Sequence, residues 1–206
     1  MGSSSEDTRV QAIARWLVQI GRERTAGWVT CSRIAGDDPF TNMLYKGFMP
    51  TKMGNAFAEA KMGELKFRSS KAKKSVFEFL KGRLNEGKFD ELMDKIGLRK
   101  FDKIKDVIRD LLKLEDELSI REGISKEKMN TLYKRLKEIP YIGEKLRHFI
   151  VYDLIRIYNF PPPDGLGPYD ELLKKLKALG IPDPEKVFRE DEWPYVDAAL
   201  WDFPSE

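Results

Sequence analysis

Apolar residues recur along most of this chain at intervals of three and four, which is the spacing of one face of an α-helix. The clearest run predicts a long amphipathic helix and consists of Phe101, Ile104, Val107, Ile108, Leu111 and Leu112. No stretch of four residues alternates convincingly between apolar and polar positions, so no strand is predicted. The pattern therefore predicts an all-α protein of about ten helices.

Capping and breaking residues mark the ends of the predicted helices. A first helix is expected from Thr8 to Gly21 and a second over 26–34, and Asp37-Asp38-Pro39 is typical of a turn and a helix start. Ser69 or Ser70 is expected to cap a helix that ends at Glu86-Gly87. Ser125 opens a later helix, and the remaining expected helices cover 89–96, 169–179, 184–189 and 195–201. Residues 1–7 are expected to be a disordered tail, because 2–5 resemble the remnant of an expression tag.

The segment Ile139-Pro140-Tyr141-Ile142-Gly143-Glu144-Lys145 separates two of these amphipathic runs. Apolar residues at helical spacing lead into this segment, at Leu132, Leu136 and Ile139. Others follow it at the same spacing, at Leu146, Phe149, Ile150, Leu154 and Ile157. Proline and glycine stop the first run, so we predict a helix, a hairpin turn and a second helix over about 131–158. A helix that starts after such a turn offers unpaired N–H groups and the positive end of its dipole to a phosphate.

These residues resemble the helix-hairpin-helix (HhH-GPD) DNA glycosylase superfamily, whose hairpin reads roughly L-P-G-V-G-x-K-x-A and precedes a P-V-D segment with an essential aspartate. Pro140, Ile142, Gly143 and Lys145 match that hairpin, and Asp164 follows Pro162-Pro163. Tyr141 stands at the position of the first hairpin glycine, and Arg147 stands at the position of the small residue, usually alanine, that follows the lysine. The similarity covers about 90–201 and includes Asp197-Ala198-Ala199-Leu200-Trp201, which resembles the closing helix of archaeal 8-oxoguanine glycosylases.

The resemblance implies a single helical domain of two lobes over 8–206. It also implies that Lys145 is a Schiff-base nucleophile and Asp164 its electrostatic and acid/base partner. A lysine ammonium is not nucleophilic, and partial burial is the usual way to make the neutral amine available, so we expect Lys145 to be partly buried. The hairpin residues expected to contact DNA are Tyr141, Ile142, Gly143, Glu144, Arg147 and His148. No cofactor is expected apart from a monovalent cation at the hairpin.

A base inside a duplex has to leave the stack before its glycosidic bond can be attacked. The aromatic candidates for stacking on that base are Trp28, Phe160, Trp193 and Trp201. Phosphate contacts would have to offset the cost of unstacking, and Lys71, Lys73 and Lys74 could supply some of them.

Each of these residues also has a plainer interpretation. Lys145 can be a solvated or phosphate-contacting charge, Asp164 can cap the following helix, and Tyr141 can be a turn residue. His148 is more often a surface histidine than a general acid. Lys71, Lys73 and Lys74 can form a solvated helix face, and Trp193 and Trp201 can belong to the core.

Composition limits the alternatives. The net charge of +3 and the pI of about 8.8 permit a DNA partner without requiring one. One cysteine, Cys31, and one histidine, His148, exclude a disulfide within this chain, a Cys/His zinc site and the four-cysteine iron–sulfur cluster of endonuclease III-like family members. No apolar run approaches 18 residues and no signal-peptide core is present, so we expect an intracellular monomer with no membrane partner.

The sequence thus favours a DNA glycosylase with AP-lyase activity that acts on double-stranded DNA containing a damaged base. An oxidised purine such as 8-oxoguanine is the favoured substrate, and an oxidised pyrimidine or a modified thymine remains open. A non-catalytic helix-hairpin-helix DNA-binding protein is the alternative. A helical interaction protein in which the hairpin is coincidental is the third hypothesis.

Overall fold

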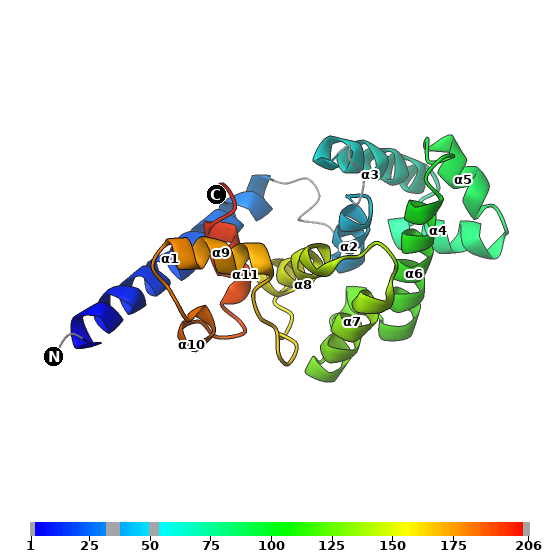
Figure 1. The fold of residues 1–206 in the computed structure, drawn as a ribbon. Coiled ribbons are helices and arrows are strands. Elements are labelled where there is room, and N and C mark those ends of the chain that lie inside the picture. Colours follow the sequence, from blue (N-terminus) through cyan, green and yellow to red (C-terminus); the bar gives the residue numbers. More distant parts are fainter. Residues whose placement is uncertain (1–2, 32–37, 50–53, 204–206) are drawn as a thin grey trace. The chain divides into compact units, whose positions relative to one another are not determined.

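A computed structural model of the chain describes residues 3–31, 38–49 and 54–203. Within these ranges the chain is all-helical and contains no strand, as the sequence predicts (Figure 1). The helices are α1 (Ser3–Cys31), α2 (Pro39–Gly47), α3 (Gly54–Lys71), α4 (Val76–Asn85), α5 (Phe89–Lys95), α6 (Asp102–Leu118), the 3-10 turn η1 (Ile120–Glu122), α7 (Lys126–Glu138), α8 (Glu144–Tyr158), α9 (Asp170–Ala178), α10 (Pro184–Val187) and α11 (Trp193–Ala199). None of the described helices is both long enough and apolar enough to span a bilayer.

The described residues fall into two compact units. Unit 1 comprises the described residues within 1–36, 125–130 and 151–206, and unit 2 comprises those within 37–124 and 131–150. The chain passes from unit 1 to unit 2 within α7, after Asn130, and returns to unit 1 within α8, after Ile150.

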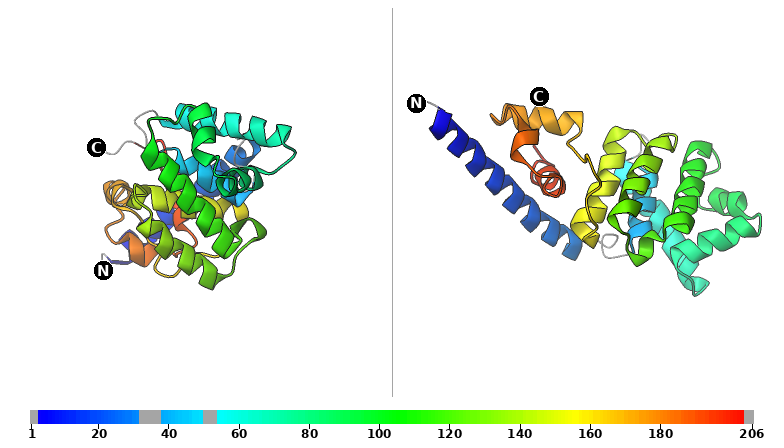
Figure 2. Two further views of the ribbon diagram at one scale, coloured as in Figure 1. Left: turned by 90° about the vertical axis from the view of Figure 1, so that its right-hand side faces the viewer. Right: turned by 90° about the horizontal axis from the view of Figure 1, so that it is seen from below.

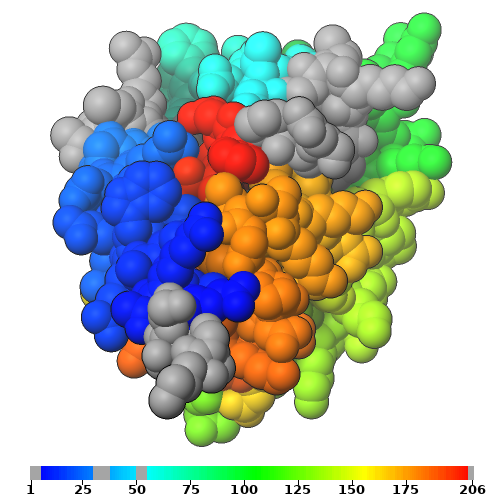
Figure 3. Space-filling view, turned by 60° about the vertical axis from the view of Figure 1, so that its left-hand side comes forward, coloured from blue at the N-terminus to red at the C-terminus, as the bar shows by residue number. Residues whose placement is uncertain are grey.

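Unit 1 is organised around α1, which packs along α11. Figure 3 shows α1 (blue) beside the later part of unit 1 (orange and red). The predicted end of the first helix at Gly21 is wrong, because α1 continues through this residue to Cys31. Gly21 is required by packing: a Cβ atom there would lie 1.8 Å from the carbonyl oxygen of Tyr195. The expected second helix is the last part of α1 as far as Cys31, and 32–34 lie outside the described residues.

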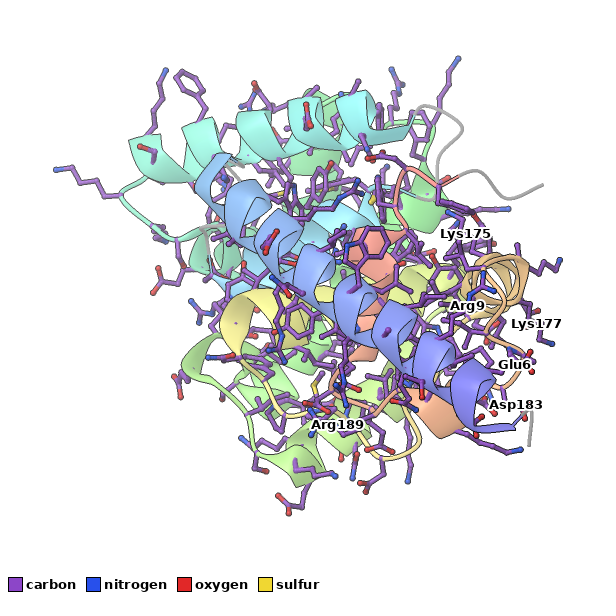
Figure 4. The ribbon with its side chains drawn as sticks, turned by 90° about the vertical axis from the view of Figure 1, so that its left-hand side faces the viewer. Glu6, Arg9, Lys175, Lys177, Asp183 and Arg189 are labelled. Carbon is purple, nitrogen blue, oxygen red and sulfur yellow. The ribbon has the colours of Figure 1, made fainter. Side chains whose placement is uncertain are left out.

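The two ends of unit 1 also differ from expectation in detail. Ser3–Asp7, which we expected in a disordered tail, form the first part of α1, and residues 1–2 lie outside the description. Helices α9, α10 and α11 match the three helices expected near the end of the chain, over 169–179, 184–189 and 195–201, to within two residues at each end. Lys175 of α9 is buried and donates a hydrogen bond of 3.0 Å to the carbonyl oxygen of Leu200. Figure 4 shows Lys175 with other charged side chains of α1, α9 and the segment before α10 in unit 1.

Unit 2 packs α2, α3, α4, α5 and α6 together, and their arrangement can be followed in Figure 2. The predicted amphipathic helix is confirmed as α6, whose buried residues include Ile104, Val107, Ile108, Leu111 and Leu112. The helix start at Asp38-Pro39 is also confirmed, since the Asp38 side chain accepts a hydrogen bond from the Thr41 N–H.

Two details of unit 2 differ from the sequence prediction. Helix α3 is not among the expected elements. Its last turn contains Ser69, which donates to the carbonyl oxygen of Lys66, so neither Ser69 nor Ser70 caps the next helix. The cap of α4 is Ser75, which forms a reciprocal capping box with Glu78.

Candidate functional site

The predicted helix, turn and helix are present: α7 ends at Glu138 and α8 begins at Glu144. Ile142 closes the turn, because its N–H donates to the carbonyl oxygen of Ile139 at 3.2 Å and its side chain is buried. Tyr141 has a φ of +69°. This left-handed conformation is natural for glycine and costs other residues about 1–2 kcal/mol. Tyr141 therefore holds a backbone geometry that glycine would adopt without this cost.

The side chain of Tyr141 is 50% exposed, although the residue lies in a tight turn. Lys103, near the start of α6, places its Nζ atom 4.5 Å from the centroid of the Tyr141 ring. A cation at this distance is attracted by the face of an aromatic ring. The hairpin thus presents an aromatic ring and an ammonium group together, and the lysine is a neighbour that the sequence did not indicate.

Lys145 lies in the first turn of α8 and is exposed, so the expected partial burial is wrong. Its Nζ atom lies 5.7 Å from the ring centroid of Phe149, one turn later. The Nζ atom of Lys46 lies 5.8 Å from the same centroid, and Lys46 is only 4% exposed. Sequence reasoning missed this buried lysine of α2, because nothing in its local pattern connects it with the hairpin.

His148 and Arg147 pack within unit 2. His148 is 3% exposed, so its interpretation as a surface histidine is wrong. Its Nδ1 atom lies 2.8 Å from the carbonyl oxygen of Glu144, and since a carbonyl only accepts, Nδ1 carries a proton. Its Nε2 atom lies 3.4 Å from the Tyr133 hydroxyl. Arg147 stacks its guanidinium carbon 4.9 Å from the centroid of the same Tyr133 ring.

The six expected DNA contacts of the hairpin therefore divide by exposure. Tyr141, Gly143 and Glu144 are exposed, Arg147 is half-buried, and Ile142 and His148 are buried. The exposed members surround the start of α8, where the first N–H groups of a helix lack partners within the helix. The buried members support the turn instead of presenting side chains to solvent.

Asp164 belongs to unit 1 and lies in a turn between α8 and α9. It caps no helix, because α9 begins at Asp170 with Tyr169 as its N-cap residue, so the plainer interpretation of Asp164 is wrong. Its Oδ2 atom accepts a hydrogen bond of 2.7 Å from Asn130, and its N–H donates to Oδ1 of Asn130 at 2.7 Å. Lys126, also of α7, pairs with Oδ1 of Asp164 at 2.7 Å.

These contacts place an exposed carboxylate in a defined orientation. The Asp164 side chain is 68% exposed despite its polar contacts. The hydrogen bond from Lys126 to Asp164 raises the pKa of the Lys126 ammonium above its ordinary value. The next residue, Gly165, donates its N–H to Glu190 at 2.8 Å and holds the other side of the turn.

The four aromatic candidates all belong to unit 1 and differ in exposure. Trp193 is 2% exposed and packs against Phe188 with ring centroids 5.2 Å apart, and Phe160 is 8% exposed. Trp201 is 46% exposed, just after α11. Trp28 is half-buried, with the guanidinium of Arg156 5.3 Å from its ring centroid. Of the four, Trp201 and Trp28 are therefore the two that solvent can reach, and Trp193 and Phe160 belong to the core.

Arg156 joins α8 to α11 through a buried network in unit 1. Its Nη2 atom lies 2.7 Å from Asp153, and its Nη1 atom lies 3.5 Å from Asp197 and donates to the Pro194 carbonyl oxygen at 3.1 Å. Tyr169 donates to Asp197 at 2.7 Å. Burial and the adjacent Asp197 carboxylate raise the pKa of the Tyr169 hydroxyl far above its ordinary value. This network ties α8 to α11, the helix that carries Asp197.

In the described part of the chain, no group of three or more His, Cys, Asp or Glu side chains is placed so that it could hold a metal ion. The monovalent cation at the hairpin stays a prediction. Comparison with protein-family models, curated proteins and solved structures returned no match.

Proposed function

We propose that this protein is a DNA glycosylase with AP-lyase activity that removes a damaged base. The observation that carries the proposal is the hairpin between α7 and α8. It combines a left-handed residue at the position of the family glycine, a lysine in the first exposed turn of α8 and the backbone donors of a helix start. This combination suits a protein that holds a DNA backbone and offers an amine beside it.

The reaction assigned to Lys145 is nucleophilic displacement at a sugar. The neutral amine attacks C1′, the bond from C1′ to the base nitrogen breaks, and the base leaves with a proton. The ring then opens to an imine between C1′ and the lysine nitrogen. Loss of a proton from C2′ and departure of the 3′ phosphate give β-elimination and a strand break. Exposure of the Lys145 side chain allows a sugar to reach it.

Asp164 is assigned the stabilisation of positive charge on the sugar. Cleavage of a glycosidic bond gives the sugar oxocarbenium character, and a fixed carboxylate stabilises this charge without reorganising during the reaction. The contacts from Asn130 and Lys126 fix the carboxylate in this way, while its 68% exposure leaves it accessible.

An oxidised purine is the favoured substrate, on the resemblance of 197–201 to the closing helix of archaeal 8-oxoguanine glycosylases. Trp201 lies in this segment, and its exposure suits contact with an extruded base. Base preference is best measured on a panel of duplexes that carry 8-oxoguanine, an oxidised pyrimidine or a modified thymine.

Trapping with sodium borohydride tests the proposal, because borohydride reduces the imine to a stable amine. Wild-type protein should form a covalent adduct with an 8-oxoguanine duplex or with a duplex that contains an abasic site. Lys145→Gln should abolish this adduct. Lys137→Gln, which changes an exposed lysine at the end of α7, is the matched control and should keep it. Trapping that persists in Lys145→Gln contradicts the assignment of the nucleophile.

The second candidate function is DNA binding through the hairpin without catalysis. The ion pair between Lys126 and Asp164 favours it, because a carboxylate already bound to a lysine has a structural role without any sugar. A wild-type protein that binds duplexes but forms no adduct and releases no base from the panel supports this function. A protein that shows no salt-dependent DNA binding belongs to the third class, a helical interaction protein.

A further inference from the structure

A basic pocket lies in unit 2, where the end of α3 meets α4 and α5. Its volume is ≈ 360 Å³, and we call it the α3–α5 pocket. Five cationic side chains line it: Arg68, Lys71, Arg83, Lys88 and Lys95. Phe79, Ala72 and Leu92 supply its apolar lining, and Phe79 and Leu92 belong to the core. The cations therefore surround a fixed hydrophobic floor that comes from more than one helix.

Carboxylates balance this charge only in part. Glu64 pairs with Arg68 at 2.6 Å, Glu91 pairs with Lys95 at 2.5 Å, and Glu86 lies 3.1 Å from Arg83 and 3.6 Å from Lys88. Three carboxylates thus face five cations, which leaves an excess of two positive charges. These surface pairs are weak and screened by salt, so an anion that contacts several cations at once can compete with them.

The excess is notable for a protein of such modest overall charge. Between Arg68 and Lys95 the sequence contains eight Lys or Arg residues and five Asp or Glu residues, an excess of three. The net charge of the whole chain is +3, so the remainder of the chain is neutral on balance. Five of these eight basic side chains line the pocket. Positive charge concentrated in this way is typical of a site for a polyanion.

An aromatic side chain accompanies the charge. Phe67 is 56% exposed, although a phenylalanine gains most when it is buried. The Nζ atom of Lys71, one turn later on α3, lies 4.3 Å from the centroid of its ring. Lys73 and Lys74 follow in the exposed turn between α3 and α4. Cations interleaved with exposed aromatics are typical of surfaces that bind nucleic acid, where the cations follow the backbone and the aromatic rings can stack on unpaired bases.

We propose that the α3–α5 pocket is a second nucleic-acid contact, separate from the hairpin, that binds backbone phosphates through Lys71, Lys88 and Lys95. This site needs no damaged base and no chemistry at Lys145, so it goes beyond the proposed function. The pocket recognises the negative charge of the phosphodiester backbone, so its binding does not depend on the base sequence. It would hold undamaged DNA as readily as a lesion.

The test measures how the affinity for an undamaged duplex depends on salt. For B-DNA, each neutralised phosphate contributes about −0.9 to the slope of log K against log salt concentration. The triple variant Lys71→Gln, Lys88→Gln and Lys95→Gln should reduce the magnitude of this slope by roughly 2 to 3. The matched control is Lys113→Gln, Lys177→Gln and Lys186→Gln, which removes the same charge from exposed lysines outside the pocket and should leave the slope close to that of wild type.

Equal slopes for the pocket variant and the control overturn the proposal, as does the absence of any binding by the wild-type protein. A second measurement titrates inorganic pyrophosphate into wild type and the pocket variant. Pyrophosphate binding that is lost in the variant while the duplex slope stays unchanged assigns the pocket to a free phosphate compound and also overturns the nucleic-acid proposal. Borohydride trapping of the same proteins on an 8-oxoguanine duplex reports the glycosylase activity separately. Unfolding temperatures equal to that of wild type show that the variants are folded.

Discussion

The side chain of Asn130 holds Asp164 at two points, through hydrogen bonds of 2.7 Å to its carboxylate and from its backbone N–H. Lys126 precedes Asn130 by one helical turn of α7 and pairs with the same carboxylate. The first turns of α7 therefore set the orientation of a residue in a distant turn. A carboxylate fixed on two sides is suited to stabilise charge, because it does not have to reorient when the charge appears.

The ion pair predicts the titration of Lys126. Its pKa is raised by the hydrogen bond to Asp164, so the ammonium should titrate above its ordinary 10.5. Because the pKa of Lys126 is higher in the folded than in the unfolded protein, the ion pair stabilises the fold fully below a pH of about 10.5. This stabilisation is lost as the pH rises through the pKa that Lys126 has in the folded protein. NMR of the lysine side chain should show the pKa of Lys126 returning toward 10.5 in Asp164→Asn. An unchanged titration would show that the pair does not persist in solution.

Asp164→Asn should separate catalysis from stability. The lost ion pair is exposed and screened by solvent, so it contributes little to the free energy of unfolding and the variant should stay folded. Loss of the carboxylate should slow base release by roughly ten-fold or more, equivalent to about 1.4 kcal/mol. Lys126→Gln is the control, since it removes the same ion pair and keeps the carboxylate. If both variants release the base at the same rate as wild type, Asp164 has no catalytic role.

Tyr141→Gly should stabilise the hairpin while changing its interaction with DNA. Glycine adopts a φ of +69° without the cost of about 1–2 kcal/mol that tyrosine incurs. Loss of the contact with Lys103 offsets part of that gain by about 0.5–1 kcal/mol. Thermal unfolding should therefore show an equal or higher midpoint. Weaker binding to an 8-oxoguanine duplex in this variant would assign the exposed ring a role in DNA contact, and Tyr141→Phe should then keep the binding.

Gly21→Ala should be strongly destabilising, whereas Gly27→Ala should not. A methyl group at Gly21 would lie 1.8 Å from the Tyr195 carbonyl oxygen, and overpacking of this kind costs typically ~1–3 kcal/mol or more. Gly27 lies in the same helix with open space around it, so alanine there should gain up to about 1 kcal/mol from its higher helix propensity. Chemical denaturation compares the two variants directly. Equal effects would contradict the close approach of α11 to α1.

The hairpin could be predicted from sequence because its determinants are local. Pro140 and Gly143 interrupt two regular apolar patterns, and both patterns are long enough to identify helices. Helix α6 was predictable for the same reason. Helix α3 was not predictable, because its apolar residues do not follow a single face. Gly21 was misinterpreted, because a glycine that allows close packing against another helix looks the same in the sequence as a glycine that ends a helix.

The surroundings of the site could not be predicted, because they depend on residues that are distant in sequence. Nothing local to Asp164 indicates Asn130, which lies on α7. The inward positions of His148 and Arg147 depend on Tyr133, whose place is known only once α7 and α8 pack together. Lys46 is nearly buried beside the Phe149 ring, and its own sequence neighbourhood reads as an ordinary helix.

The buried network around Arg156 implies a constraint on how this protein can diverge. The side chains of Asp153, Arg156 and Asp197 are 0%, 6% and 2% exposed, so the guanidinium is the buried counter-charge of two carboxylates. Removing one member of a buried ion pair costs about 3–5 kcal/mol, which is a large share of the stability of a typical domain. Single substitutions at these positions should therefore be rare among descendants of this chain, and changes should occur jointly. Covariation of 153, 156 and 197 would mark unit 1 as an inherited architecture even in relatives whose hairpin has lost the lysine.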